Sequence, residues 1–300
     1  MRNAFIDELV SLAKTNDEIC LVVGDLGYKV IEPFADEFPE RFFNAGVAEQ
    51  NMMGLSAGLS SEGMHPFVYS IANFPTFRCA EQIRNDVDYH NLNLTVVTVG
   101  GGLAYGNLGY SHHAIQDYSL MRTMPNMRIC SPGDPYEVRG IMRFLMHNPG
   151  PSYLRLGRAG EEVLHENIPD VNLGNWLPVK EAEGKNLILS TGASMHIASN
   201  LANFNEQYSH YTIPVWGMKS KDIQKTLSLS WNRIVTIEDH LQDGGFGSWL
   251  MESLVGDDAE IKKVRNISLD SKICGMVGKQ STLNAEGGLN SNINLASLYE

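Results

Sequence analysis

Hydrophobic positions in the first half of the chain alternate between a helical and an extended pattern. Apolar side chains recur at a helical period over residues 3–14, and Ile19–Val23 then forms the continuous apolar run that is typical of a parallel strand buried on both faces. The same alternation predicts helices at 48–60, 77–89 and 135–146 and strands at 67–70, 94–99, 127–130 and 153–156. This alternation of strands and helices indicates an α/β domain with a mainly parallel sheet.

The pattern weakens after residue 158 and resumes near residue 185. The weak stretch contains Pro169, Pro178 and several charges, so we expect a linker at 161–184 between two consecutive α/β domains, 1–160 and 185–300. In the second domain the pattern predicts strands at 187–189, 211–215, 234–237 and 264–267, and helices at 194–205 and after 248. The last twenty residues are polar and fit either a short helix or partial disorder.

Composition narrows the possible functions. Hydrophobic residues make up 43% and the net charge is −12, which excludes a disordered chain and argues against a general binder of nucleic acid or anionic membranes. A local basic pocket for a phosphate stays possible. The four cysteines form no CxxC pair, the N-terminus carries acids where a signal peptide needs an apolar run, and no stretch approaches the ~18–20 apolar residues of a membrane span. A soluble, cytoplasmic protein is expected.

Two candidate sites lie in the first hundred residues. Glu49 stands in the first turn of a predicted helix that is rich in small residues, where an acid either performs chemistry or simply stabilises the helix dipole. Phe74 and Phe77 follow a predicted strand end, the part of an α/β sheet where ligands gather. These two aromatic rings can form a slot for a flat ligand or can serve only for packing.

Three further motifs follow strand ends. A loop with five glycines in ten residues runs from Gly100 to His113, but it matches neither GxGxxG nor the P-loop, and its paired histidines lack a third metal ligand. Arg155 and Arg158 can bind a phosphate or form ordinary ion pairs. The acid–histidine run at 238–240 lacks the G-x-S-x-G elbow of a hydrolase, so a structural turn or subunit contact is the better interpretation.

Taken together, these motifs resemble the C-terminal half of transketolase, in the form made as a separate subunit of a split, two-subunit enzyme. The resemblance covers nearly the whole chain, and its most specific block is the run G-V-A-E-Q-N at 46–51. The other matching segments are 2–5, 23–26, 43–45, 66–68, 81–84, 111–113, 121–122, 125–127, 150–156, 237–240 and 244–247.

The resemblance implies a thiamine-diphosphate-dependent enzyme built from a pyrimidine-binding domain and a transketolase-type C-terminal domain. In this family a separate region holds the cofactor's diphosphate through Mg²⁺, using a Gly-Asp-Gly stretch and a downstream Asn. This chain lacks Gly-Asp-Gly, because Gly24-Asp25 is followed by Leu26. The chain is therefore expected to need an N-terminal transketolase subunit that brings the diphosphate site and the Mg²⁺, with two such pairs in a heterotetramer.

The same resemblance assigns roles to the cofactor-facing residues. Glu49 is expected to hydrogen-bond the pyrimidine ring nitrogen and so to promote formation of the thiazolium carbanion. Phe74 is expected to stack on the pyrimidine, with Ile71 and Phe77 as walls of the slot and Asp25 beside the cofactor. Ile71 departs from the family, in which an aromatic residue is usual at this position.

Substrate roles also follow from the resemblance. His112 is expected to contact the donor sugar or to assist proton transfer, and Arg158, with Arg2, to meet an acceptor phosphate. Typical transketolases carry an Asp at the position of Leu108 and often a His at the position of Gly100. Both changes remove polar groups from the sugar-facing wall and put the identity of the substrate in question.

The leading hypothesis is transfer of a two-carbon ketol unit from a ketose to an aldose, with sugars or sugar phosphates as substrates. The alternatives within the cofactor class are a deoxyxylulose-phosphate-synthase-like condensation and a 2-oxo-acid dehydrogenase β subunit. A non-catalytic regulatory partner is the alternative from another class. The retained Glu49, Phe74 and His112 argue against that last interpretation.

Overall fold

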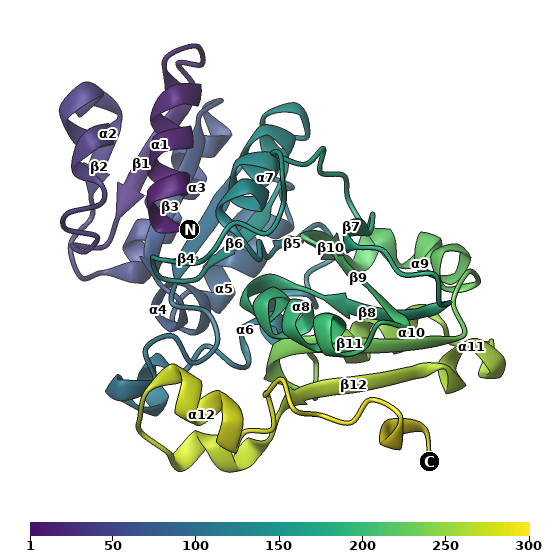
Figure 1. The fold of residues 1–300 in the computed structure, drawn as a ribbon. Helices are drawn as coiled ribbons and strands as arrows, with labels where there is room; N and C mark the ends of the chain where they lie inside the picture. The colour runs from purple at the N-terminus through teal and green to yellow at the C-terminus, as the bar shows by residue number, and fades with distance from the viewer.

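Two α/β sheets lie side by side in the computed structural model, which describes residues 1–300 (Figure 1). The first sheet has the order β10-β5-β6-β4-β3-β1-β2, and every pairing in it is parallel except that of β10 with β5. Its strands are β1 (Ile19–Val23), β2 (Phe42–Asn44), β3 (His65–Ile71), β4 (Thr95–Val99), β5 (Arg128–Cys130), β6 (Ser152–Leu156) and β10 (Val215–Gly217).

Helices cover both faces of the first sheet because its strands are apolar on both sides. Leu21 and Val23 of β1 belong to the core cluster that includes Phe5 and Val138, whereas Val22 packs in the cluster that includes Met52. The helices are α1 (Arg2–Ala13), α2 (Glu32–Glu37), α3 (Glu49–Ser61), α4 (Asn73–Phe77), α5 (Ala80–Gln82) with a π-helical turn (Ile83–Asp88), α6 (Asp117–Met121) and α7 (Pro135–His147).

The second sheet has the order β12-β11-β8-β9-β7, with β7 antiparallel to β9 and the other pairs parallel. Its strands are β7 (Leu177–Lys180), β8 (Asn186–Ser190), β9 (Tyr208–Thr212), β11 (Arg233–Leu241) and β12 (Val264–Leu269). Its helices are α8 (Met195–Phe204), α9 (Lys221–Ser228), α10 (Phe246–Ser253), α11 (Asp258–Lys262) and α12 (Gln280–Glu286). The helix α12 packs against the glycine-rich loop of the first half, where the Gly278 N–H donates to the Gly106 carbonyl at 3.2 Å.

Several sequence expectations need correction. The single strand expected at 211–215 is wrong: Pro214 interrupts it, so β9 joins the second sheet and β10 crosses to the first. The helix expected at 77–89 is broken at Arg78-Cys79. The stretch expected as a linker contributes β7 as an edge strand, and Leu283, Leu289 and Leu295 anchor the C-terminal stretch in a buried core.

A buried ion cluster joins the two halves where β6 and β11 end. The Arg155 guanidinium donates to Asp117 Oδ2 and to Asp239 Oδ1, each at 2.7 Å, and lies 4.4 Å from the Tyr118 ring centroid. Burial alone would lower the pKa of Arg155, but the two carboxylates outweigh it and raise that pKa, so the guanidinium stays charged. Residues 238–240 thus have a structural role, since Glu238 also accepts the Gly247 N–H at 2.9 Å at the start of α10.

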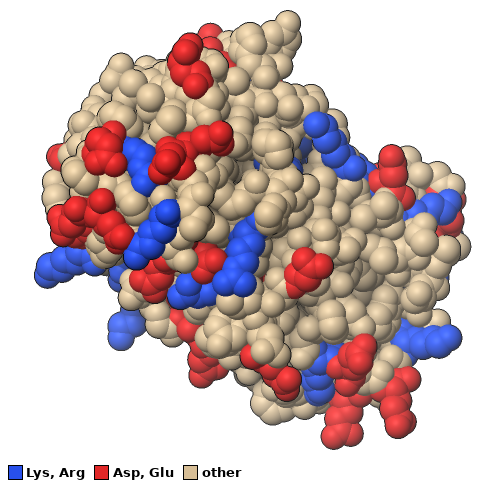
Figure 2. Space-filling model, turned by 90° about the horizontal axis from the view of Figure 1, so that it is seen from above, with Lys and Arg blue, Asp and Glu red and all other residues tan.

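Charged groups on the surface show no single-sign field on the face drawn in Figure 2, where basic and acidic side chains are interspersed. No helix is long and apolar enough to cross a membrane.

Replacing Arg155 with Met should lower the free energy of unfolding by about 3–5 kcal/mol, because the variant leaves the buried Asp117 and Asp239 carboxylates uncompensated. Urea unfolding monitored by circular dichroism measures the change. The control is Lys14→Met, which removes an exposed pair with Glu37 and should cost less than about 1 kcal/mol. Equal losses in the two variants would show that the cluster is not what joins the halves.

Candidate functional site

The candidate residues gather at one edge of the first sheet because they follow the carboxyl ends of neighbouring parallel strands. Glu49 opens α3 after β2, and Phe74 lies on α4 after β3. His112 lies in the loop after β4, and Arg158 follows β6. In α/β sheets this edge is where ligands bind.

Glu49 lies at a small cavity and is paired with an arginine that the sequence analysis overlooked. Its side chain is only 8% exposed, and Oε1 accepts a hydrogen bond from Arg78 Nη1 at 2.7 Å. The Arg78 Cζ also lies 4.1 Å from the centroid of the Phe74 ring. The cavity measures about 500 Å³ and is lined by Ala48, Glu49, Gln50, Asn51 and Arg78. A carboxylate and an aromatic face are therefore presented together.

A row of rings continues from Phe74 toward Arg158. The His112 ring meets the Phe74 ring edge-on at 5.4 Å, and the Tyr105 ring meets His112 at 6.5 Å. The Arg158 Cζ lies 5.3 Å from the Tyr105 ring centroid. We call Phe74, His112 and Tyr105 the ring row; Arg78 stands at one end of it and Arg158 at the other.

His112 lies in the middle of the ring row and is only partly shielded. Burial, followed by the nearby His113 and Arg78, lowers the pKa of His112, so its imidazole is neutral at pH 7. The Ser111 hydroxyl lies 3.0 Å from Nδ1. A neutral imidazole at this place can donate one hydrogen bond and accept another.

Position 100 explains why Tyr105 stands in the row. Gly100 has φ +89°, and a Cβ added there would overlap the Tyr105 ring. The glycine therefore removes one side chain and admits another. Sequence reasoning missed Tyr105, although the glycine at the start of the loop was a signal that something packs closely against the backbone.

Other predicted residues lie at the edges of this arrangement. Arg2 adjoins Arg158, since its backbone N–H donates to the Arg158 carbonyl at 3.2 Å. Asp25 is tied to the strand that precedes Glu49, because its carboxylate accepts from Asn44 Nδ2 at 3.0 Å; the Asn44 bond, followed by that of Tyr28, lowers the pKa of Asp25.

The structure separates two predicted residues from the Glu49 cavity. Phe77 lines a neighbouring groove of about 650 Å³ with Tyr110 and Leu120, and it does not line the cavity. Leu108 lies in a short 3₁₀ turn (Gly106–Leu108) with about half of its surface exposed. Ile71 ends β3 and is half-buried. No group of three or more His, Cys, Asp or Glu residues is placed to hold a metal ion.

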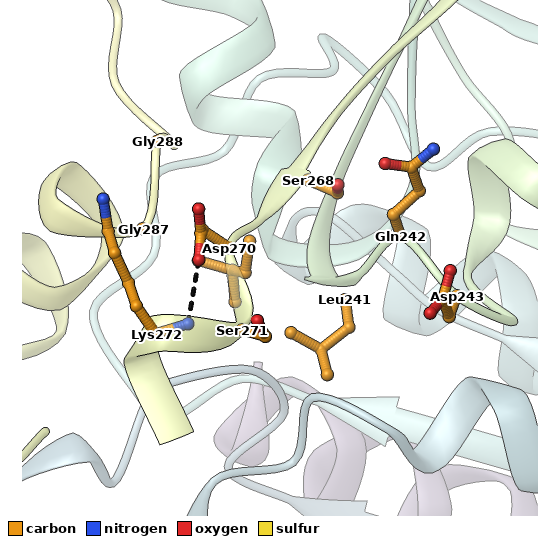
Figure 3. Close-up of a pocket in the computed structure, with 10 residues that line it drawn as sticks. Leu241, Gln242, Asp243, Ser268, Asp270, Ser271, Lys272, Gly287 and Gly288 are labelled. Carbon is orange, nitrogen blue, oxygen red and sulfur yellow. Dashed lines mark hydrogen bonds between the residues drawn. The ribbon is translucent and has the colours of Figure 1, made fainter. Parts of the chain in front are cut away.

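A second cavity of about 500 Å³ lies where β11 and β12 end, far along the chain from the predicted residues (Figure 3). Its wall is polar, and the Asp270 carboxylate there accepts the backbone N–H of Lys272 at 2.8 Å, which caps a turn. The cavity holds no aromatic face and none of the candidate residues. It is therefore a weaker candidate than the Glu49 cavity.

Comparison with known proteins agrees with this geometry. The family model described as transketolase, pyrimidine binding domain, matches residues 1–160. The chain belongs to the transketolase family. It is 32% identical to a putative transketolase C-terminal section from Methanocaldococcus jannaschii, over 94% of this chain and 90% of that protein. It is also 32% identical to one of the subunits of an apulose-4-phosphate transketolase from Phocaeicola vulgatus, over 84% and 83% of the two chains.

Structural comparison confirms the expected fold class. A solved structure of a split gene transketolase, an inactive β4 tetramer, has a TM-score of 0.84 and 30% identity, and the match covers 99% of this chain and 96% of that one. The family depends on thiamine diphosphate. A 1-deoxy-D-xylulose-5-phosphate synthase from Clostridium perfringens is 31% identical over 86% of this chain, which spans only 43% of that longer transketolase-like relative.

The titration of His112 provides a test of the site geometry. Nuclear magnetic resonance of the ¹³C-labelled histidines should give His112 a pKa below its ordinary value of 6.5, because burial disfavours the charged ring. A His112→Gln variant assigns the resonance. A pKa at or above 6.5 would mean that the ring is open to water and does not stand between Phe74 and Tyr105.

Proposed function

We propose that this chain is the pyrimidine-binding subunit of a two-subunit transketolase, which transfers a two-carbon ketol unit from a ketose to an aldose. The observation that carries the proposal is the joint presentation of the Glu49 carboxylate and the Phe74 ring at one cavity. A flat group that carries N–H donors fits between them, since the Arg78 guanidinium already occupies that position.

The residues fit the aminopyrimidine end of thiamine diphosphate. Thiamine diphosphate, when bound, supplies a nucleophilic thiazolium carbon that can accept a two-carbon unit. Glu49 would accept a hydrogen bond from the pyrimidine ring nitrogen and hold a proton there, and its burial keeps water from competing for that bond. Phe74 would stack on the ring, with Ile71, Phe77 and Asp25 around the slot.

The ring row would form the substrate wall. His112, as a neutral imidazole, would hydrogen-bond the sugar oxygens or move a proton beside the cofactor. Arg158, with Arg2 next to it, would hold an acceptor phosphate. Leu108 and Gly100, which contribute no polar side chain, favour a substrate that differs from that of typical transketolases.

The missing half of the site supports a partner subunit. We propose that the partner brings Gly-Asp-Gly, the diphosphate contacts and the Mg²⁺ ligands, since Mg²⁺ needs a fixed set of oxygen ligands and this chain shows no such group. Exposed Val47, Leu55 and Phe77 flank the Glu49 cavity in the chain and offer the partner an apolar surface. The names of the split relatives support a heterotetramer of two pairs.

Two other functions compete with this proposal. Deoxyxylulose-phosphate synthases share about the same identity with this chain, so a synthase-like condensation is the second candidate. The intact Glu49, Phe74 and His112 speak against a regulatory partner without catalysis. Four free cysteines, three of them buried, support a cytoplasmic location.

Reconstitution decides between these functions. The chain is mixed with a partner subunit that carries Gly-Asp-Gly, thiamine diphosphate and Mg²⁺, and ketose donors are compared with pyruvate. Ketol transfer from ketoses supports the proposal. Turnover of pyruvate alone favours the synthase-like alternative, and no turnover of any donor contradicts both.

In the reconstituted enzyme, Glu49→Gln should lower kcat by roughly 100-fold or more, because the amide cannot take part in proton transfer. The fold should persist, since Gln keeps the shape and can still accept the Arg78 hydrogen bond. Glu62→Gln, at the exposed end of α3, is the matched control and should keep full activity. Near-normal turnover by the Glu49 variant would remove this residue from the mechanism.

A further inference from the structure

We propose that Arg78 occupies the pyrimidine slot in the free subunit and must leave when the cofactor enters. The inference rests on the proposed function. It assigns to Arg78 the part of an internal stand-in for the aminopyrimidine ring.

The contacts of Arg78 are those that the proposal gives to the cofactor. Its guanidinium is flat, stacks over Phe74 at 4.1 Å and donates to Glu49 Oε1 at 2.7 Å. A flat aminopyrimidine offers the same combination of a stacking face and an N–H donor. The Phe74 face and the Glu49 oxygen each accommodate one such partner, so Arg78 and the cofactor exclude each other.

Arg78 is placed so that it can leave at low cost. It lies in the break between α4 and α5, and its side chain is 50% exposed. The bond to Glu49 is the single hydrogen bond of its guanidinium. Exposed ion pairs and cation–π contacts are individually weak, so their loss corresponds to a roughly three- to tenfold change in affinity. Until then the pair keeps the shielded Glu49 carboxylate from standing alone.

The test is calorimetry of the reconstituted pair with thiamine diphosphate and Mg²⁺. Arg78→Met should bind the cofactor about three- to tenfold more tightly than the wild type, because nothing has to be displaced. Arg78→Lys should fall between them, since it keeps the charge and loses the flat fork. Thiamine, which lacks the diphosphate, should show the same order, which separates occupation of the slot from attraction of the phosphates.

Arg84→Met is the control, because Arg84 is exposed and bonds only Asn85; its affinity should equal that of the wild type. Equal or weaker binding by Arg78→Met overturns the inference and leaves the proposed function standing. Absence of binding by every variant contradicts the proposed function, and the inference falls with it.

A second inference comes from the space at Gly100. We propose that Tyr105 contacts the sugar substrate and takes the place of the side chain that Gly100 lacks. A Cβ at Gly100 would overlap the Tyr105 ring, and that ring lies between His112 and Arg158. The Tyr105 hydroxyl makes no hydrogen bond to another residue, so it is free to bond a hydroxyl or phosphate oxygen of a substrate.

Kinetics of Tyr105→Phe test this role in the reconstituted enzyme. Loss of one hydrogen bond should lower kcat/KM about fivefold and change the ranking of ketose donors that differ in hydroxyl configuration, while cofactor affinity stays constant. Tyr89→Phe, on an exposed side chain, is the control. An unchanged kcat/KM and ranking for Tyr105→Phe overturns the inference. Absence of ketol transfer by the wild type contradicts the proposed function instead.

Discussion

The Arg155 guanidinium is the constraint on which the rest of the molecule depends. It neutralises carboxylates from both halves and also donates to the Ala114 carbonyl at 2.7 Å. A Cβ at Gly101 would stand 2.8 Å from the same guanidinium. Arg155 thus fixes the beginning and the end of the loop that carries Tyr105 and His112. The glycines of this loop serve close packing, which is one reason that the loop matches no nucleotide-binding motif.

The geometry that follows presents half of an active site. One sheet edge gathers a shielded carboxylate, a ring row and flanking arginines, and all of these groups suit the flat, uncharged end of a cofactor and a sugar. The other end of that cofactor is a diphosphate, which an acidic chain with no cluster of metal ligands is poorly suited to hold. The account therefore places the complete site at an interface with another polypeptide.

Sequence patterns revealed the elements that are buried on both faces and missed those that depend on tertiary contacts. The run Ile19–Val23 was predicted to the residue because every side chain in β1 is buried. Pro214 was the overlooked signal that splits the expected strand at 211–215 between two sheets. The short helices α2, α9 and α11 escaped prediction because they are brief and largely polar.

The candidate site divides in the same way. The resemblance pointed to Glu49, Phe74, His112 and Arg158, and the structure places them along one wall. Arg78 and Tyr105 were invisible to it. Their importance lies in contacts with Glu49 and Gly100, which are 29 and 5 residues away along the chain. Such pairings depend on how strand ends meet and cannot be read from local spacing.

Cofactor binding to the isolated chain is the measurement that tests the half-site account most directly. Calorimetry with thiamine diphosphate and Mg²⁺ should show no tight binding to this chain alone, and stoichiometric, Mg²⁺-dependent binding once the partner subunit is added. Tight, stoichiometric and Mg²⁺-dependent binding to the isolated chain would contradict the account, because it would show that the chain holds the diphosphate and the metal by itself.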